Sequence, residues 1–69
     1  MENNWVKIYT SPNFYRAEII KQMLNENDVD AVLINKQDSS YNAFGNAEVW
    51  IHQENFSTAI ELINQLELE

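Results

Sequence analysis

The segment Ala47–His52 constrains the fold of this 69-residue chain most strongly. Small or apolar residues alternate in it with bulkier or polar ones, in the order Ala47, Glu48, Val49, Trp50, Ile51, His52. A period of two is typical of a β-strand, because successive side chains point to opposite faces of a sheet. The segment lies between the single glycine, Gly45, and a helical pattern that begins near Asn55. We therefore expect it to be the central strand of a small sheet.

Two further segments have the character of strands. Residues 5–10 alternate strictly and consist mainly of β-branched and aromatic side chains, which favours a first strand. Residues 30–36 are predicted to form the second strand. We expect Val32 and Ile34 to face the helices and Leu33 to lie on the opposite face. The reverse assignment stays open, because this run is apolar on both sides.

Two segments carry apolar residues at helical spacing, about residues 12–26 and about residues 55–66. The stripe of the first consists of Phe14, Ala17, Ile20, Met23 and Leu24. The stripe of the second consists of Phe56, Ala59, Ile60, Ile63 and Leu66. Ser11 followed by Pro12 marks the start of the first helix, with Asn13 as a competing cap. Asn27 is the candidate left-handed residue after its last turn.

The element order is therefore β-α-β-β-α in a single α+β domain spanning residues 1–69. A third strand that inserts antiparallel between the first two gives the sheet order 1-3-2, with both helices on one face. This is the ferredoxin-like split βαβ arrangement without its last strand.

The alternation divides the sheet residues between two faces. The face toward the helices is predicted to hold Val6, Ile8, Val32, Ile34, Val49 and Ile51, beneath Ala17, Ile20, Leu24, Ala59, Ile60 and Ile63. The other face is predicted to hold Trp5, Lys7, Tyr9, Leu33, Glu48, Trp50 and His52. Two helices do not easily cover both faces, so we expect a large apolar patch on the second face, formed by Trp5, Tyr9, Leu33 and Trp50.

The connection of residues 37–46 is longer than a tight hairpin turn. Gly45 suits a closing turn with positive φ. Tyr41 and Phe44 are unusual for a solvated loop. They either fold onto the sheet and close the core, or extend the aromatic surface.

Four basic residues against eleven acidic ones give a formal charge of −7. That charge disfavours nucleic acid, because phosphate neutralisation dominates such binding, and it disfavours an anionic membrane surface. No apolar run approaches the about 20 residues that cross a bilayer, and the polar N-terminus does not resemble a signal peptide. With no cysteine in the chain, we expect a cytoplasmic protein.

The side chains do not predict an enzyme. His52 is the only histidine, so neither a metal site nor activation of Ser39 or Ser40 as a nucleophile is expected. One glycine excludes a glycine-rich phosphate loop. We expect no cofactor, no bound metal and no catalytic residue.

Several segments together resemble a known family. They are Trp5–Ser11, Ala17–Leu24, Asn35–Tyr41, Phe44-Gly45 and Glu48–Ile51. The chain resembles the small bacterial family called "putative prokaryotic signal-transducing protein", a domain of unknown function, over nearly its whole length. The resemblance implies a ferredoxin-like fold related in shape to the nitrogen-regulatory PII proteins. The family has no established catalytic or ligand-binding residues to carry over, and the long nucleotide-linked loop of PII proteins has no obvious counterpart in this sequence.

The leading hypothesis is a non-enzymatic interaction or signal-transducing module. It would act through its sheet face or sheet edges, by homodimerisation or by docking a protein partner. The residues predicted to contact the partner are Trp5, Tyr9, Leu33, Tyr41, Phe44, Trp50 and His52. The alternative is a regulatory sensor that binds a small molecule in a pocket at the 37–46 loop.

Overall fold

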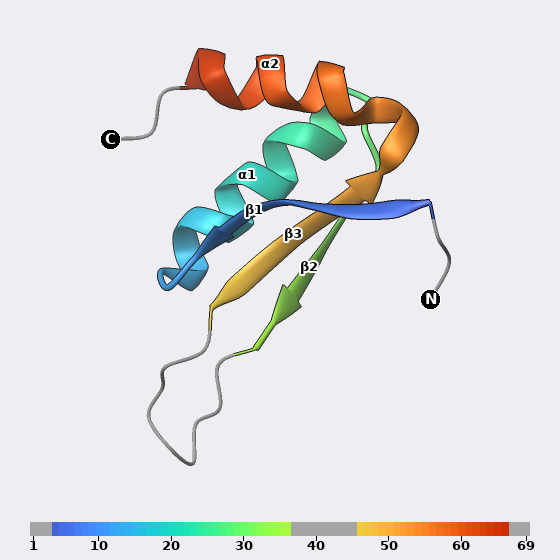
Figure 1. The fold of residues 1–69 in the computed structure, drawn as a ribbon. Helices are drawn as coiled ribbons and strands as arrows, with labels where there is room; N and C mark the ends of the chain where they lie inside the picture. The colour runs from blue at the N-terminus through green and yellow to red at the C-terminus, as the bar shows by residue number, and fades with distance from the viewer. Residues whose placement is uncertain (1–3, 37–45, 67–69) are drawn as a thin grey trace.

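The computed structural model describes residues 4–36 and 46–66. Its elements in chain order are β1 (Trp5–Ser11), α1 (Phe14–Glu26), β2 (Ala31–Asn35), β3 (Ala47–His52), the short 3₁₀ helix η2 (Gln53–Asn55) and α2 (Phe56–Leu66). The strands form one sheet in the order β1-β3-β2, and β3 is antiparallel to both neighbours. Both helices lie on the same side of the sheet (Figure 1). The predicted fold class and strand order are confirmed.

The core lies between β3 and the helices. Ala47, Val49 and Ile51 are fully buried, as the alternation of this strand predicts. They share one cluster with buried residues of both helices, of the turn after α1 and of the start of β2: Ala17, Ile20, Leu24, Val29, Ala31 and Ala59. The helix-facing side of β3 is thus the centre of the fold, and its other side carries Glu48, Trp50 and His52.

The predicted orientation of β2 is wrong. Leu33 pairs with Val49 and packs against the core, whereas Val32 and Ile34 are 42% and 36% exposed on the other face. Residues directly opposite each other in adjacent strands share a face, so the register with β3 decides which side of β2 is buried. The sequence of β2 does not, because both of its sides are apolar.

A bulge in β1 overturns a second expectation. Lys7 pairs with Trp50 and Tyr9 pairs with Val49, so Ile8 is an extra residue against β3. A bulge shifts every later side chain to the opposite face. Tyr9, predicted beside Trp50, therefore packs against the core on the helix side, together with Val6 and Ile8.

The start of α1 follows the competing cap. The Asn13 side-chain oxygen accepts hydrogen bonds from the amides of Tyr15 and Arg16, at 3.0 and 3.3 Å. The Ser11 hydroxyl accepts one from the amide of Asn13 at 2.9 Å. The helix thus begins two residues later than Pro12. Phe14, predicted in its apolar stripe, is exposed.

The end of α1 is a Schellman motif. The Val29 amide donates to the Leu24 carbonyl at 2.9 Å, and the Asp28 amide donates to the Asn25 carbonyl at 3.2 Å. Asp28 has φ 68°, so it is the left-handed residue in place of the predicted Asn27. Val29 is buried and covers the last turn.

The apolar face of α2 differs partly from its predicted stripe. Ala59 is buried, and Ile63 and Leu66 pack against the core as predicted. Leu62 packs there as well, whereas Phe56 is exposed. Phe56 is the first residue of α2, directly after η2, where the chain turns away from the end of β3.

Candidate functional site

The open face, defined here as the sheet face away from the helices, is the candidate site. The register arranges its strand residues in three rows: Trp5 with His52; Lys7 with Trp50 and Val32; Thr10 with Glu48 and Ile34. β3 supplies the middle residue of the two full rows. No described helix covers this face (Figure 1).

An apolar hollow lies on the open face. Trp5, Val32, Ile34 and Trp50 line it, and its volume is about 130 Å³. Each strand contributes to it, so its shape depends on the register of the whole sheet. Two exposed β-branched side chains and two half-buried indoles form a contiguous apolar surface, which is typical of an interaction site.

The Glu48 carboxylate lies between the Trp50 indole and the Lys7 ammonium group and contacts both. The Trp50 Nε1–H donates to Glu48 Oε1 at 3.0 Å. Lys7 Nζ lies 3.6 Å from Glu48 Oε2, as an ion pair across β1 and β3. The hydrogen bond from Trp50 lowers the pKa of Glu48; desolvation opposes this, and the charges of Lys36 and Lys7 support it. The carboxylate is therefore ionised near neutral pH.

The first row of the open face is a ring contact. The centroids of the Trp5 and His52 rings are 4.1 Å apart, with an angle of 36° between their planes. The contact holds the Trp5 indole at the rim of the hollow. It leaves both ring systems on the surface, because both residues are only half-buried.

The model of the family described as "Putative prokaryotic signal transducing protein" matches residues 5–67. The chain belongs to this family. No curated protein and no solved structure matches it. Membership of the signal-transducing family confirms the resemblance drawn from the sequence, and its description gives no ligand and no binding residue.

The structure brings together three of the residues predicted to contact a partner in this family member. Trp5, Trp50 and His52 lie on the open face. Tyr9 and Leu33 lie on the helix side, and their predicted place on the aromatic face is wrong. Tyr41 and Phe44, and most of the loop proposed to form a small-molecule pocket, lie outside the described residues.

Sequence reasoning missed Val32 and Ile34 as open-face residues. The reverse assignment of the two faces of β2, which the sequence also allows, places Val32 and Ile34 on the open face. Choosing that assignment needs the register against β3, in which Val32 lies opposite Trp50.

The sheet edges are weaker candidates than the open face. In the described residues, β1 and β2 each pair on one side only. Proteins protect such edges with bulges, lysines and short strands. β1 contains the bulge at Ile8 and the exposed Lys7, and β2 has only five residues. These features oppose the addition of a further strand, so the face is the better surface.

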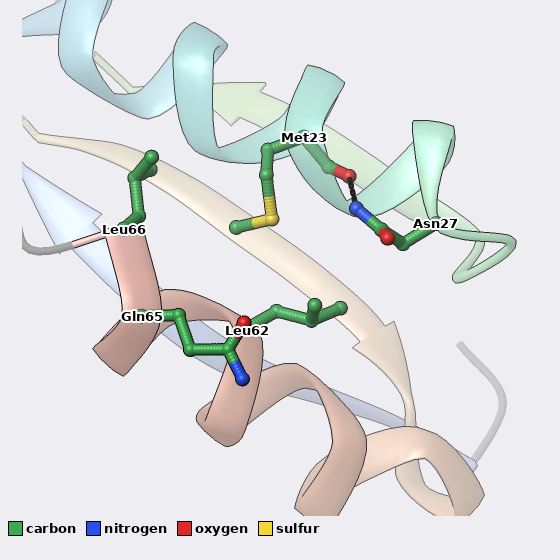
Figure 2. Close-up of a pocket in the computed structure, with 5 residues that line it drawn as sticks. All are labelled: Met23, Asn27, Leu62, Gln65 and Leu66. Carbon is green, nitrogen blue, oxygen red and sulfur yellow. Dashed lines mark hydrogen bonds between the residues drawn. The ribbon is translucent and has the colours of Figure 1, made fainter.

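A second hollow lies between the helices. Met23 and Asn27 of the α1 end and Leu62, Gln65 and Leu66 of α2 line its volume of about 280 Å³. Figure 2 shows the Met23 side chain extending from α1 toward α2, while the Asn27 amide turns back to α1. Asn27 Nδ2 donates to the Met23 carbonyl at 2.8 Å. This Asn27 N–H is already bonded within the α1 end, so the hollow is a weaker candidate site than the open face.

A third and more polar hollow lies where β3 ends. Asn4, His52, Gln53 and Glu54 line it, and its volume is about 570 Å³. The Gln53 amide donates to the Asn4 carbonyl, which ties the chain before β1 to η2. The part of the chain with known placement contains no group of three or more metal-ligating side chains. It also contains no helix long and apolar enough to cross a membrane.

Proposed function

We propose that this member of the signal-transducing family is a non-enzymatic interaction module that self-associates through its open face. The observation that carries the proposal is the exposed apolar hollow of Trp5, Val32, Ile34 and Trp50 on a face without a helix. Burying apolar surface is the main favourable contribution to association. Tryptophan is also enriched among the residues that dominate binding energies.

The charge distribution is compatible with a second copy as the occupant, because the strand residues of the open face are nearly neutral. The chain has a formal charge of −7, yet the strand residues of the open face include one lysine and one glutamate, which pair with each other. Acidic residues of the helices, such as Glu18 and Glu61, lie in the layer on the opposite side of the sheet. Two copies stacked face to face would therefore place their helix carboxylates far apart, where salt screens the repulsion.

The size of the face predicts a weak dimer. β3 has six residues, so the face is about 20 Å long and, with three strands, about 14 Å wide. Its projected area is well below the roughly 800 Å² that each partner buries in a standard interface. We therefore expect a reversible dimer with a dissociation constant in the micromolar range or weaker, of order 10⁻⁶ to 10⁻⁴ M. A reversible association suits a signalling role.

Sedimentation velocity over a wide range of protein concentration tests the proposal. The wild type should shift from monomer to dimer as concentration rises, and Trp50→Ala and Trp5→Ala should shift the transition to higher concentration. Tyr15→Ala is the matched control, because Tyr15 is an exposed aromatic residue on α1. Circular dichroism checks that each variant is folded. A wild type that stays monomeric at millimolar concentration, or face variants that dimerise as readily as Tyr15→Ala, would refute it.

A further inference from the structure

We propose that Glu48 is a positioning residue that holds the Trp50 indole in the orientation required for docking. This proposal rests on the proposed self-association of the open face and adds a residue that prepares that face. Glu48 lies two residues before Trp50 on β3, so both side chains emerge on the same face.

The Glu48 carboxylate contacts one side chain through each of its oxygens. One carboxylate oxygen accepts the Trp50 Nε1–H at 3.0 Å, and the other faces Lys7 Nζ at 3.6 Å. The Glu48 side chain is 13% exposed and that of Lys7 is 46% exposed. The carboxylate is thus enclosed between an indole and an ammonium group, and each of its oxygens has a partner on the open face.

Two physical effects make this arrangement useful for binding. An indole that is already ordered in the monomer loses less conformational freedom on association, which favours binding. The second effect concerns the indole N–H, which a stacked sheet would remove from water. A buried donor without an acceptor is costly, and Glu48 supplies that acceptor before the partner arrives.

The two substitutions Glu48→Gln and Glu48→Leu separate this role from a purely structural one. The glutamine oxygen can still accept the indole N–H, whereas leucine cannot. The same two substitutions at Glu61, which is exposed on α2, are the controls. The wild type should show slower solvent exchange of the Trp50 indole hydrogen than of the Trp5 indole hydrogen, measured by NMR at dilutions where the chain is monomeric. Glu48→Leu should abolish that protection and Glu48→Gln should keep most of it.

The same variants are then followed by sedimentation. We expect Glu48→Leu to raise the dimer dissociation constant about ten-fold or more, and Glu48→Gln to raise it much less. Equal indole exchange in the wild type and in Glu48→Leu would overturn the proposal, as would a lost protection with unchanged dimerisation. A wild type that never dimerises would refute the proposed function instead, and the indole exchange measured in the monomer would still show whether Glu48 holds Trp50.

Discussion

At the scale of single residues, Asp28 has an unfavourable backbone conformation that allows α1 to end sharply. Its φ of 68° is the only positive value at a non-glycine residue in the described part of the chain. This conformation is unfavourable for residues with a Cβ atom. The carboxylate also follows the C-terminus of α1, where the helix dipole disfavours negative charge, and the last turn contains no basic residue.

Asp28→Gly should therefore stabilise the protein. Glycine adopts the left-handed conformation without strain and removes the unfavourable charge, against a larger loss of backbone entropy on folding. We expect the free energy of unfolding to rise by about 0.5–1 kcal/mol. Urea denaturation at neutral pH measures the change. Gln22→Gly, at an exposed position inside α1, is the control and should destabilise. A decrease for Asp28→Gly would contradict the Schellman geometry.

A second residue-scale prediction concerns acid. The Trp50 hydrogen bond, with the Lys36 and Lys7 charges, lowers the pKa of Glu48 in the folded protein. A lowered folded pKa contributes stability that is fully present above the unfolded pKa of about 4 and is lost as the pH falls through the folded value. Stability should therefore decrease below about pH 4.

Glu48→Gln isolates this contribution. The variant should be less stable than the wild type at neutral pH, and the difference should shrink as the pH falls below about 4. Urea midpoints at several pH values measure it, with Glu61→Gln as the control. A difference that stays constant with pH would show that the Glu48 interactions do not depend on its charge.

At the scale of secondary structure elements, the buried side of a strand can be predicted from the sequence only where polar residues mark its other side. The buried side of β3 is predictable because all residues on that side are apolar, whereas the other side carries Glu48 and His52. That of β2 is not, because its buried side is set by pairing with β3 and no polar residue marks its exposed side. Periodicity also cannot reveal a bulge, which is why the predicted face of Tyr9 is wrong. Phe14 and Phe56 match a helical stripe but are the first residues of their helices and stay exposed.

The register of the sheet predicts opposite outcomes for two valines. Val49 is fully buried on the helix side of β3, and Val32 is exposed on the open face of β2. Val49→Asp buries an unpaired charge and should unfold the domain, whereas Val32→Asp should leave it folded. Circular dichroism and the dispersion of amide signals in NMR distinguish the two states. If Val32→Asp unfolds and Val49→Asp does not, the assignment of the faces is wrong.

At the scale of the whole molecule, the chain combines a small core with an exposed apolar hollow on the open face. In residues 4–36 and 46–66, nine buried apolar residues form one cluster, and several of them are alanines. A domain of this size has a small margin of stability. Association through the open face would add to that margin by mass action, because the dimer forms only from folded chains.

The midpoint of thermal unfolding should therefore rise with protein concentration. The rise should be larger at high ionic strength, where the repulsion between two chains of charge −7 is screened. Trp50→Ala should remove the dependence on concentration, and Tyr15→Ala should keep it. Differential scanning calorimetry over a roughly hundred-fold range of protein concentration measures the midpoint, because a range of that size changes the dimer fraction. A midpoint independent of concentration would contradict self-association.

The bulge at Ile8 makes the two ends of the open face different in composition. Before the bulge β1 contributes Trp5 and Lys7 to this face, and after it only Thr10. The aromatic rings are therefore gathered at the end where β1 and β2 begin and β3 finishes. If two faces overlap fully, a two-fold axis parallel to the strands places aromatic end on aromatic end, whereas an axis across the strands places it on the Thr10 end. One extra residue in an edge strand therefore makes the two symmetries of such a stacked pair inequivalent, and contact between the aromatic ends requires the axis parallel to the strands.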